Sequence, residues 1–235
     1  MAKLTAIQTL NAVLRNIGEA QVASITALTG IQLVAWDKIT EAMQDLVTDQ
    51  NTRWSFLESL GQVTLSTGNN AYTITGLTSG SDMMIEDKES VRSSDSGRRI
   101  PYKTPQEWDA MYPKGITTDA TGYPDFYTKY ANQFVFNKQA SSVQNTKNID
   151  FRYWKLPTYF ATATSTGTTE IPEPFDRTLL VALATLKTMT YLGNPEASVY
   201  KVQVFGNDRD IEGSLDKMKR LFTSPLLKPR MTYRF

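Results

Sequence analysis

Apolar residues recur at three- and four-residue steps near both ends of the chain, which is the spacing of one face of an α-helix. This spacing predicts four helices, over residues 4–17, 32–50, 174–192 and 195–222. Thr5 is the expected N-cap of the first helix, and Gly18 suits the left-handed position after its end. Gly206 and Gly213 fall inside the last predicted helix, where each costs about 1 kcal/mol relative to alanine.

The middle of the chain alternates apolar and polar residues instead, which is typical of strands with one buried face. Two β-hairpins are expected, one in QVTLSTGNNAYTITGL with its turn at Gly68–Asn70 and one in PDFYTKYANQFVFNK with its turn at Ala131–Asn132. Between them, TPQEWDAMYP predicts a short helix capped by Thr104. The stretch NIDFRYWKLP predicts a last long strand, in which one face carries Ile149, Phe151 and Tyr153.

The order of these elements predicts an α+β protein. Because each amphipathic stripe must find an apolar partner, the helices are expected to close one discontinuous bundle of about four helices, built from residues 1–60 and 172–222. The antiparallel β segment, residues 61–171, is expected as an inserted barrel or sandwich-like domain. Residues 223–235 contain two prolines and no helical stripe, so they are predicted to leave the bundle as an extended C-terminal tail.

The composition excludes several kinds of site. The chain has no cysteine and no histidine, which removes disulfides, thiolate or imidazole metal ligands, cysteine nucleophiles and the Ser-His-Asp triad. Neither glycine-rich phosphate-binding motif, G-x-x-x-x-G-K-[ST] or G-x-G-x-x-G, occurs. The sequence therefore predicts no catalytic residues, no cofactor and no metal, and a protein that is not an enzyme.

Charge and hydropathy give no sign of a nucleic-acid or membrane partner by themselves. The formal net charge is +1, so no strong overall field attracts DNA or an anionic membrane. No apolar run approaches the roughly 20 residues that a membrane helix needs. The N-terminus lacks the uninterrupted apolar segment of a secretory signal, because Asn11 and Arg15 interrupt it. We expect a soluble protein that is made in the cytoplasm.

Two acidic groups and two basic groups are the remaining candidates for chemistry. Paired carboxylates can act as acid and base or bind a divalent ion, but a solvated face is the favoured interpretation of these runs. The basic residues near the end of the last helix suit its dipole. The dipole does not explain Arg230 and Arg234, which lie beyond the helix. The acidic candidates are Glu86, Asp87, Glu89, Asp208, Asp210 and Glu212, and the basic ones are Arg92, Arg98, Arg99, Lys103, Lys217, Lys219, Arg220, Lys228, Arg230 and Arg234.

The C-terminal tail is unusually apolar for a free segment. LLKPRMTYRF contains five large apolar side chains, and burying each is worth about 1.5–3 kcal/mol. One alternative is that the tail folds back onto its own bundle. The other is that it docks on another subunit, with its leucine, methionine and aromatic side chains in pockets and its arginines on acidic rims.

The order of motifs resembles a known family. LNAVLRNIGEAQVASITALTG is similar to the opening of tail tubular protein A and related head-to-tail adaptor proteins of short-tailed bacteriophages. Gln21 stands where a proline is common in that family, while Trp54 and Phe56 after the second helix fit it. The succession GYPDFYTKYANQFVFNK, IDFRYWKLPT and EIPEPFDRTLLVALA also resembles the family layout of hairpin, strand end and third helix. The matching residues of the opening are Leu10, Asn11, Leu14, Ile17, Gly18, Glu19, Val22, Ser24 and Ile25.

This resemblance implies a structural virion protein at the head–tail interface. Such adaptors form a ring, usually of twelve copies, that docks under the portal protein, extends the DNA channel and carries the tail nozzle protein. Double-stranded DNA would pass through the lumen without sequence-specific contact. Tyr153 and Trp154 would be strand-end aromatics in the core or an interface. The portal-binding residues implied in the tail are Leu226, Leu227, Pro229, Arg230, Met231, Tyr233, Arg234 and Phe235.

Two other functions remain open at this point. One is a different phage component, such as a nozzle or tail-completion protein. The other is a metal-free hydrolase that uses paired carboxylates, for which Glu86 and Asp208 would be the residues to test.

Overall fold

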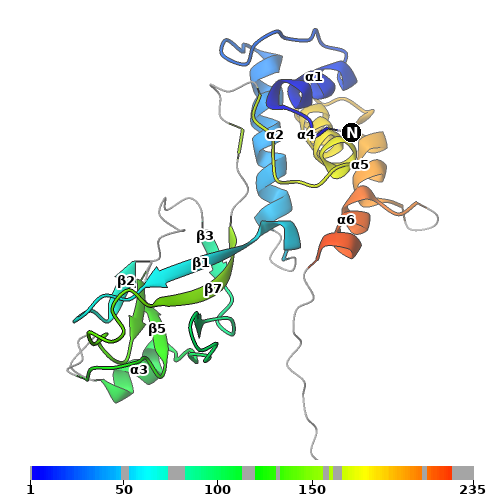
Figure 1. Cartoon of the computed structure of the whole chain (residues 1–235). Helices are drawn as coiled ribbons and strands as arrows, with labels where there is room; N and C mark the ends of the chain where they lie inside the picture. The colour runs from blue at the N-terminus through cyan, green and yellow to red at the C-terminus, as the bar shows by residue number, and fades with distance from the viewer. Residues whose placement is uncertain are drawn as a thin grey trace, which may run out of the picture. The chain divides into compact units, whose positions relative to one another are not determined.

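The structure is a computed structural model of the 235-residue chain (Figure 1). It describes residues 2–48, 53–73, 83–112, 120–130, 133–155, 159–160, 166–207 and 211–223. The chain forms two compact units. Unit 1 comprises residues 1–57 and 157–235, and unit 2 comprises residues 58–156. Unit 1 carries most of the helices and unit 2 all of the strands (Figure 1).

The helices of unit 1 are arranged around one apolar helix. Helix α4 (Val181–Tyr191) continues a π-helical turn, η2 (Asp176–Leu180), and contacts α1 (Ala6–Asn16), α2 (Ile31–Thr48) and α5 (Ala197–Phe205). Side chains on several sides of α4 are buried, among them Leu183, Ala184 and Met189. A helix that is apolar on most of its surface belongs in the centre of a core. The predicted helix over 174–192 is confirmed in this central position.

Helix α1 begins and ends as its sequence predicts. The Thr5 hydroxyl accepts a hydrogen bond from the Gln8 backbone N–H at 3.4 Å, and the Gln8 side chain accepts from the Thr5 N–H at 3.0 Å. This capping box satisfies two N–H groups that the first turn would otherwise leave without a partner. Gly18 follows the helix with φ of +80°, so the predicted left-handed stop is confirmed. The buried face of α1 includes Leu10, Val13 and Leu14.

The single helix predicted over 195–222 is wrong. The structure has two helices there, α5 and α6 (Ser214–Phe222), with Gly206 at φ of +79° between them. A Cβ on Gly206 would overlap the carbonyl oxygen of Ile211, and a Cβ on Gly213 would overlap that of Val204. The two glycines allow the chain to turn and bring α6 against α5, which an uninterrupted helix could not do.

Four aromatic side chains meet where the chain leaves and re-enters the helices of unit 1. We call Trp54, Phe56, Phe175 and Phe222 the junction cluster. Neighbouring ring centroids lie 5.6 Å apart for Trp54 and Phe56, 6.0 Å for Phe56 and Phe222, and 5.9 Å for Phe175 and Phe222. The Trp54 indole also donates a buried hydrogen bond to the Leu46 carbonyl at 2.6 Å. The cluster therefore ties α2, η2 and α6 together.

Unit 2 contains two antiparallel sheets and a short helix. In the first sheet β7 (Asn148–Lys155) pairs on one side with β1 (Glu58–Thr64) and on the other with β3 (Met83–Glu86) and β4 (Arg92–Ser93). In the second sheet β6 (Gln133–Phe136) lies between β2 (Ala71–Thr73) and β5 (Tyr127–Tyr130).

The predicted strand at 148–157 is confirmed as β7, with Ile149, Phe151 and Tyr153 buried on one face. The hairpin predicted in 124–138 is confirmed by the pairing of β5 with β6, while its turn at Ala131–Asn132 lies outside the described residues.

The hairpin predicted around Gly68–Asn70 is wrong, because β1 and β2 belong to different sheets. The turn residues carry the chain away from β1 instead: the Gly68 N–H donates to the Ala140 carbonyl at 2.9 Å. The Tyr72 hydroxyl then donates to the Asn69 carbonyl at 2.8 Å. The alternation of β1 matches β7, which lies about ninety residues later, as shown by the pairing of Glu58 with Trp154.

One aromatic core joins the two sheets of unit 2. Its buried side chains come from both, and the rings of Phe134 and Phe151 meet edge to face at 5.0 Å between their centroids. Helix α3 (Pro105–Met111) adds the buried Trp108, and its capping box on Thr104 confirms the predicted helix start. The α+β class is therefore confirmed: the described residues form six helices and two small antiparallel sheets, and these strands close no barrel.

None of the helices in the described part of the chain is both long and apolar enough to cross a membrane.

The first prediction concerns Gly61, which pairs with Phe151 across β1 and β7. A Cβ at this position would overlap the Phe151 ring, which is almost fully buried. We expect Gly61→Ala to lower the free energy of unfolding by about 1–3 kcal/mol, the usual cost of overpacking a core. Chemical denaturation of the wild type and the variant measures this difference in unfolding free energy. In a Phe151→Leu background the same change should cost much less, and an equal cost there would contradict this account.

The second prediction tests the buried face of η2. Leu179 is fully buried, so Leu179→Asp places an unpaired charge in the core of unit 1 and should cost about 4 kcal/mol or more, enough to unfold it. Thr178→Asp is the matched control, because the neighbouring Thr178 is exposed. Circular dichroism and thermal melting compare the folding of the two variants. A Leu179→Asp protein that melts like the control would refute this packing.

Candidate functional site

Contacts hold the residues that directly precede the predicted portal-binding tail. Helix α6 ends at Phe222, a member of the junction cluster, and Thr223 forms a backbone bridge with Trp54. The segment that follows therefore starts beside a rigid aromatic cluster. The eight predicted portal-binding residues lie outside the described residues, namely Leu226, Leu227, Pro229, Arg230, Met231, Tyr233, Arg234 and Phe235.

The two strand-end aromatics lie on opposite faces of β7. Tyr153 is buried on the inner face, with its ring centroid 5.9 Å from that of Phe151. Trp154 is half-buried on the other face and is paired in register with Glu58 of β1 and Ile85 of β3. Tyr153 thus belongs to the core of unit 2, while Trp154 lies on the outer face of its sheet. Their neighbour Pro157 lies outside the described residues.

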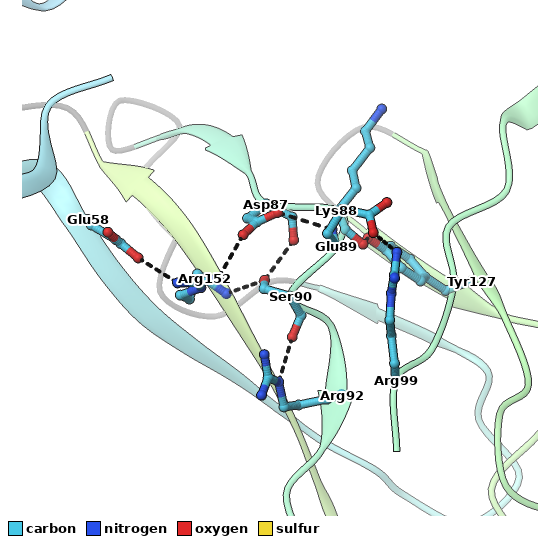
Figure 2. Close-up of polar contacts among 9 residues, drawn as sticks. All are labelled: Glu58, Asp87, Lys88, Glu89, Ser90, Arg92, Arg99, Tyr127 and Arg152. Carbon is cyan, nitrogen blue, oxygen red and sulfur yellow. Dashed lines mark hydrogen bonds and ion pairs between the residues drawn. The ribbon is translucent and has the colours of Figure 1, made fainter. Parts of the chain in front are cut away.

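Arg152, at the centre of β7, holds the first sheet together on its outer face (Figure 2). Its guanidinium contacts the Glu58 carboxylate at 3.3 Å and the Asp87 carboxylate at 3.2 Å. Its backbone N–H donates to the Ser90 hydroxyl at 2.7 Å, and that hydroxyl donates to the Asp87 carbonyl, also at 2.7 Å. We call Glu58, Asp87, Ser90 and Arg152 the Arg152 clamp, because they connect β1 and β7 with the turn after β3.

The acidic candidates are largely engaged in such contacts. Asp87 belongs to the clamp, Glu89 forms an ion pair with Arg99 (Figure 2), and Glu212 contacts Arg220 at 3.0 Å. The side chain of Glu86 is not described, and Asp208 and Asp210 lie outside the described residues. Where the structure is described, no three acidic side chains come together to hold a metal ion. The carboxylates that can be seen connect strands and helices.

The basic cluster on unit 2 is neutralised in the same way. Arg98 contacts Asp125 at 2.9 Å, and Lys103 lies 3.6 Å from Glu107. A Lys138 hydrogen bond lowers the pKa of Asp125 despite partial burial, so this carboxylate stays charged. Arg92 donates to the Ser90 carbonyl at 3.2 Å (Figure 2). The run of basic residues in the sequence is thus no free cationic patch on the folded unit.

Three other shifted groups in unit 2 have structural causes. The Thr104 backbone N–H in the capping box of α3 lowers the pKa of Glu107. Burial raises the pKa of Tyr130 to about 12, and the hydrogen bond from its hydroxyl to Asp109 at 2.7 Å adds to the shift. Burial also raises the pKa of Tyr123. None of these groups is set to exchange protons near neutral pH, as an acid or base catalyst would be.

Two hollows lie on the surface formed by the described residues of unit 1. One, of about 370 Å³, lies between α1 and the start of α4 and contains Arg15 and Arg177. The other, of about 510 Å³, is a groove between α2, α4 and α5. Lys187 crosses this groove and contacts Asp45 at 2.6 Å. Sequence reasoning missed both, because each is formed by helices far apart in the chain.

Large apolar side chains are exposed on the second half of unit 1. Single exposed apolar residues are normal on a protein surface, but a concentration of them in neighbouring helices indicates an interaction surface. They extend from the end of α4 through α5 and α6, and they are Tyr191, Leu192, Val199, Phe205, Ile211 and Leu221.

Comparison with known proteins gives one match. The sequence model of a family described as SU10 adaptor protein matches residues 4–224, which span both units. A search of curated proteins found no match.

The third prediction tests how much the Arg152 clamp stabilises unit 2. The Arg152 side chain is partly exposed, so its two ion pairs are screened and Arg152→Ala should cost only about 1 kcal/mol of unfolding free energy. Arg152→Lys should lose part of this stability too, since a single ammonium matches two carboxylates poorly. Urea denaturation at low and high salt measures both. A wild-type advantage that persists in high salt would contradict the clamp.

Proposed function

The chain belongs to the SU10 adaptor protein family, a family of phage head–tail adaptors, and from this premise we propose that it forms the ring between the portal and the tail nozzle. Membership assigns it a structural role at the head–tail junction of a virion. The match over residues 4–224 is the observation that carries the proposal, because it includes the helices, both sheets and the start of the tail. The resemblance to phage adaptors implies that the ring has twelve copies.

A ring needs two different contact faces on every copy. In a cyclic assembly each subunit presents one surface to the neighbour before it and another to the neighbour after it. The exposed apolar residues of α4, α5 and α6 supply one such surface, since their burial against a neighbour would be favourable. Lateral contacts of this kind would use the helical unit of the chain.

The C-terminal tail is proposed to bind the portal. Twelve residues follow Thr223, and a fully extended segment of that length spans about 40 Å. Its five large apolar side chains offset the conformational entropy that is lost when the tail becomes ordered. The bridge between Thr223 and Trp54 supports the proposal, because it holds the residue at which the tail begins.

The DNA channel is proposed to carry double-stranded DNA without holding it. Tight pairing of many cations with phosphates would oppose sliding. The net charge of +1 suits free passage, and so do the ion pairs that occupy Arg98, Arg99 and Lys103. The nozzle protein would then attach to the face of the ring away from the portal.

The fourth prediction tests the tail. Deletion of residues 224–235 keeps Thr223 and its bridge to Trp54, so the truncated protein should melt like the full chain and yet fail to capture the portal protein of the same phage in a pull-down.

Two full-length variants separate the contribution of the apolar side chains of the tail from that of its basic side chains. Serine at Leu226, Leu227, Met231, Tyr233 and Phe235 should abolish capture, because it removes the apolar anchors. Glutamine at Lys228, Arg230 and Arg234 should weaken capture less and mainly remove its salt dependence. Portal capture by the truncated protein at the level of the full chain would overturn the assignment of the tail.

A further inference from the structure

The hollow between α1 and α4 gathers positive charge on its surface. Arg15 and Arg177 both line it, and none of its described lining residues is a carboxylate. The buried Asp176 lies behind its wall, where it accepts a hydrogen bond from the Leu4 N–H. Arg177 donates to the Ala2 carbonyl at 3.1 Å, and neither guanidinium forms an ion pair within the described part of the chain. Both arginines are exposed. We call this hollow the Arg15–Arg177 cavity.

The cavity is held open by contacts on its walls. The parallel packing of α1 along α4 is fixed at one end by the hydrogen bond from the Leu4 N–H to Asp176 at 2.7 Å. At the other end the Asn16 side chain donates to the Thr185 hydroxyl at 3.2 Å. Asn11 exchanges two hydrogen bonds with Val22, at 2.9 and 2.8 Å, and so holds the loop after α1 against the helix. The two guanidiniums are therefore presented by a rigid frame.

A surface of the opposite kind lies at the turn between α4 and α5. The chain reverses at Gly193, with φ of +68°, and the Asn194 side chain accepts from the Glu196 N–H at 2.9 Å. Glu196 is exposed and forms no ion pair with the described residues. Tyr191 and Val199 beside it are each 64% exposed. We call residues 191–199 the α4–α5 corner, a turn that exposes three large apolar side chains and one carboxylate.

We propose that the α4–α5 corner of one copy seats in the Arg15–Arg177 cavity of the next copy, with the Glu196 carboxylate between the two guanidiniums. The inference rests on the proposed ring and assigns its lateral contact. Two guanidiniums around one carboxylate form charge-assisted hydrogen bonds. The exposed apolar residues of the corner would be covered around this pair, as in the centre of a protein interface.

The contact must join different copies. Val181 lines the cavity and Tyr191 begins the corner, and ten residues of one helix separate them by about 15 Å. A corner therefore cannot enter the cavity of its own chain. Because the cavity and the corner are different surfaces, each copy has one of each, and the contact is heterologous and able to close a ring.

DNA fits the cavity less well than a protein carboxylate does. A DNA duplex presents one phosphate charge per about 1.7 Å of its length. Proteins that bind it therefore use rows of cationic side chains along a surface. Here two arginines stand among amide and apolar side chains, and the apolar corner offers a partner that phosphate would not need.

The experiment uses the absence of native cysteine. Full-length chains carrying Ala12→Cys in the cavity lining, Ser198→Cys in the corner, or both are treated with a short bis-maleimide, which leaves Arg15, Arg177 and Glu196 in place. A linker is used because the two backbones are expected to lie too far apart for a disulfide. The double variant should give a ladder of dimer, trimer and higher species, alone or with portal protein present. Each single variant should give none, while a mixture of the two should give dimers.

Charge reversal supplies the second readout. Arg15→Glu or Glu196→Arg alone should weaken self-association roughly tenfold or more, as loss of a close interfacial charge pair does, and the double reversal should recover much of it. Asp37→Arg is the matched control, because Asp37 is an exposed carboxylate on α2 outside the contact. Its self-association should stay that of the wild type. Melting curves check that each exposed substitution leaves the fold intact.

Each other outcome overturns a defined part of the account. A wild-type ring without a ladder from the double cysteine variant, or with dimers from one single variant, refutes this contact but leaves the ring. A wild-type chain that stays monomeric at every concentration, with and without portal, refutes the ring and the contact together. If Arg15→Glu weakens binding of a DNA duplex and leaves self-association unchanged, the cavity is a phosphate site and the proposal fails.

Discussion

The edge-to-face packing of Phe222 against Phe56 and Phe175 is the contact on which the arrangement of this chain depends. These rings, with Trp54, close unit 1 at the place where three segments from distant parts of the sequence meet. Immediately after the cluster the chain enters β1, and immediately after Phe222 it becomes the C-terminal tail. One aromatic cluster, in which Trp54 and Phe175 are buried, therefore lies at the start of both the β segment and the tail.

This arrangement suits an adaptor because it separates the tasks of the chain. The helical unit is packed around α4, and its outer helices expose the apolar side chains that we propose as lateral contacts. The tail is proposed to bind a different partner, the portal. Unit 2 has its own aromatic core and its own clamp around Arg152. Ion pairs inside the units occupy Asp87, Glu89 and Glu212 among the acidic candidates, whereas Arg15, Arg177 and Glu196 form no ion pair with the described residues and are the charges that we propose for a neighbouring copy.

Local pattern was enough to predict the elements whose determinants lie close in sequence. The capping boxes at Thr5 and Thr104 mark helix starts, and the alternation of β7 shows which residues face the core. Local pattern failed where a distant contact decides. It could not show that β1 pairs with β7 and not with β2, nor that Gly213 must let α6 approach Val204.

The candidate site was predictable to a smaller extent. The tail was found from its composition, and its proposed role is a prediction that the described residues do not test. The Arg15–Arg177 cavity had no sequence signature, because its two arginines are 162 positions apart and meet only through the packing of α1 along α4. In the sequence Arg15 merely interrupts an apolar run.

Cryo-electron microscopy of the full chain bound to its portal tests the central claim most directly. The account predicts a closed annulus coaxial with the portal, in which helical units touch side by side and each C-terminal segment crosses onto a portal subunit. A map in which the chain sits as separate monomers off the axis, with that segment packed on its own helices, would contradict it.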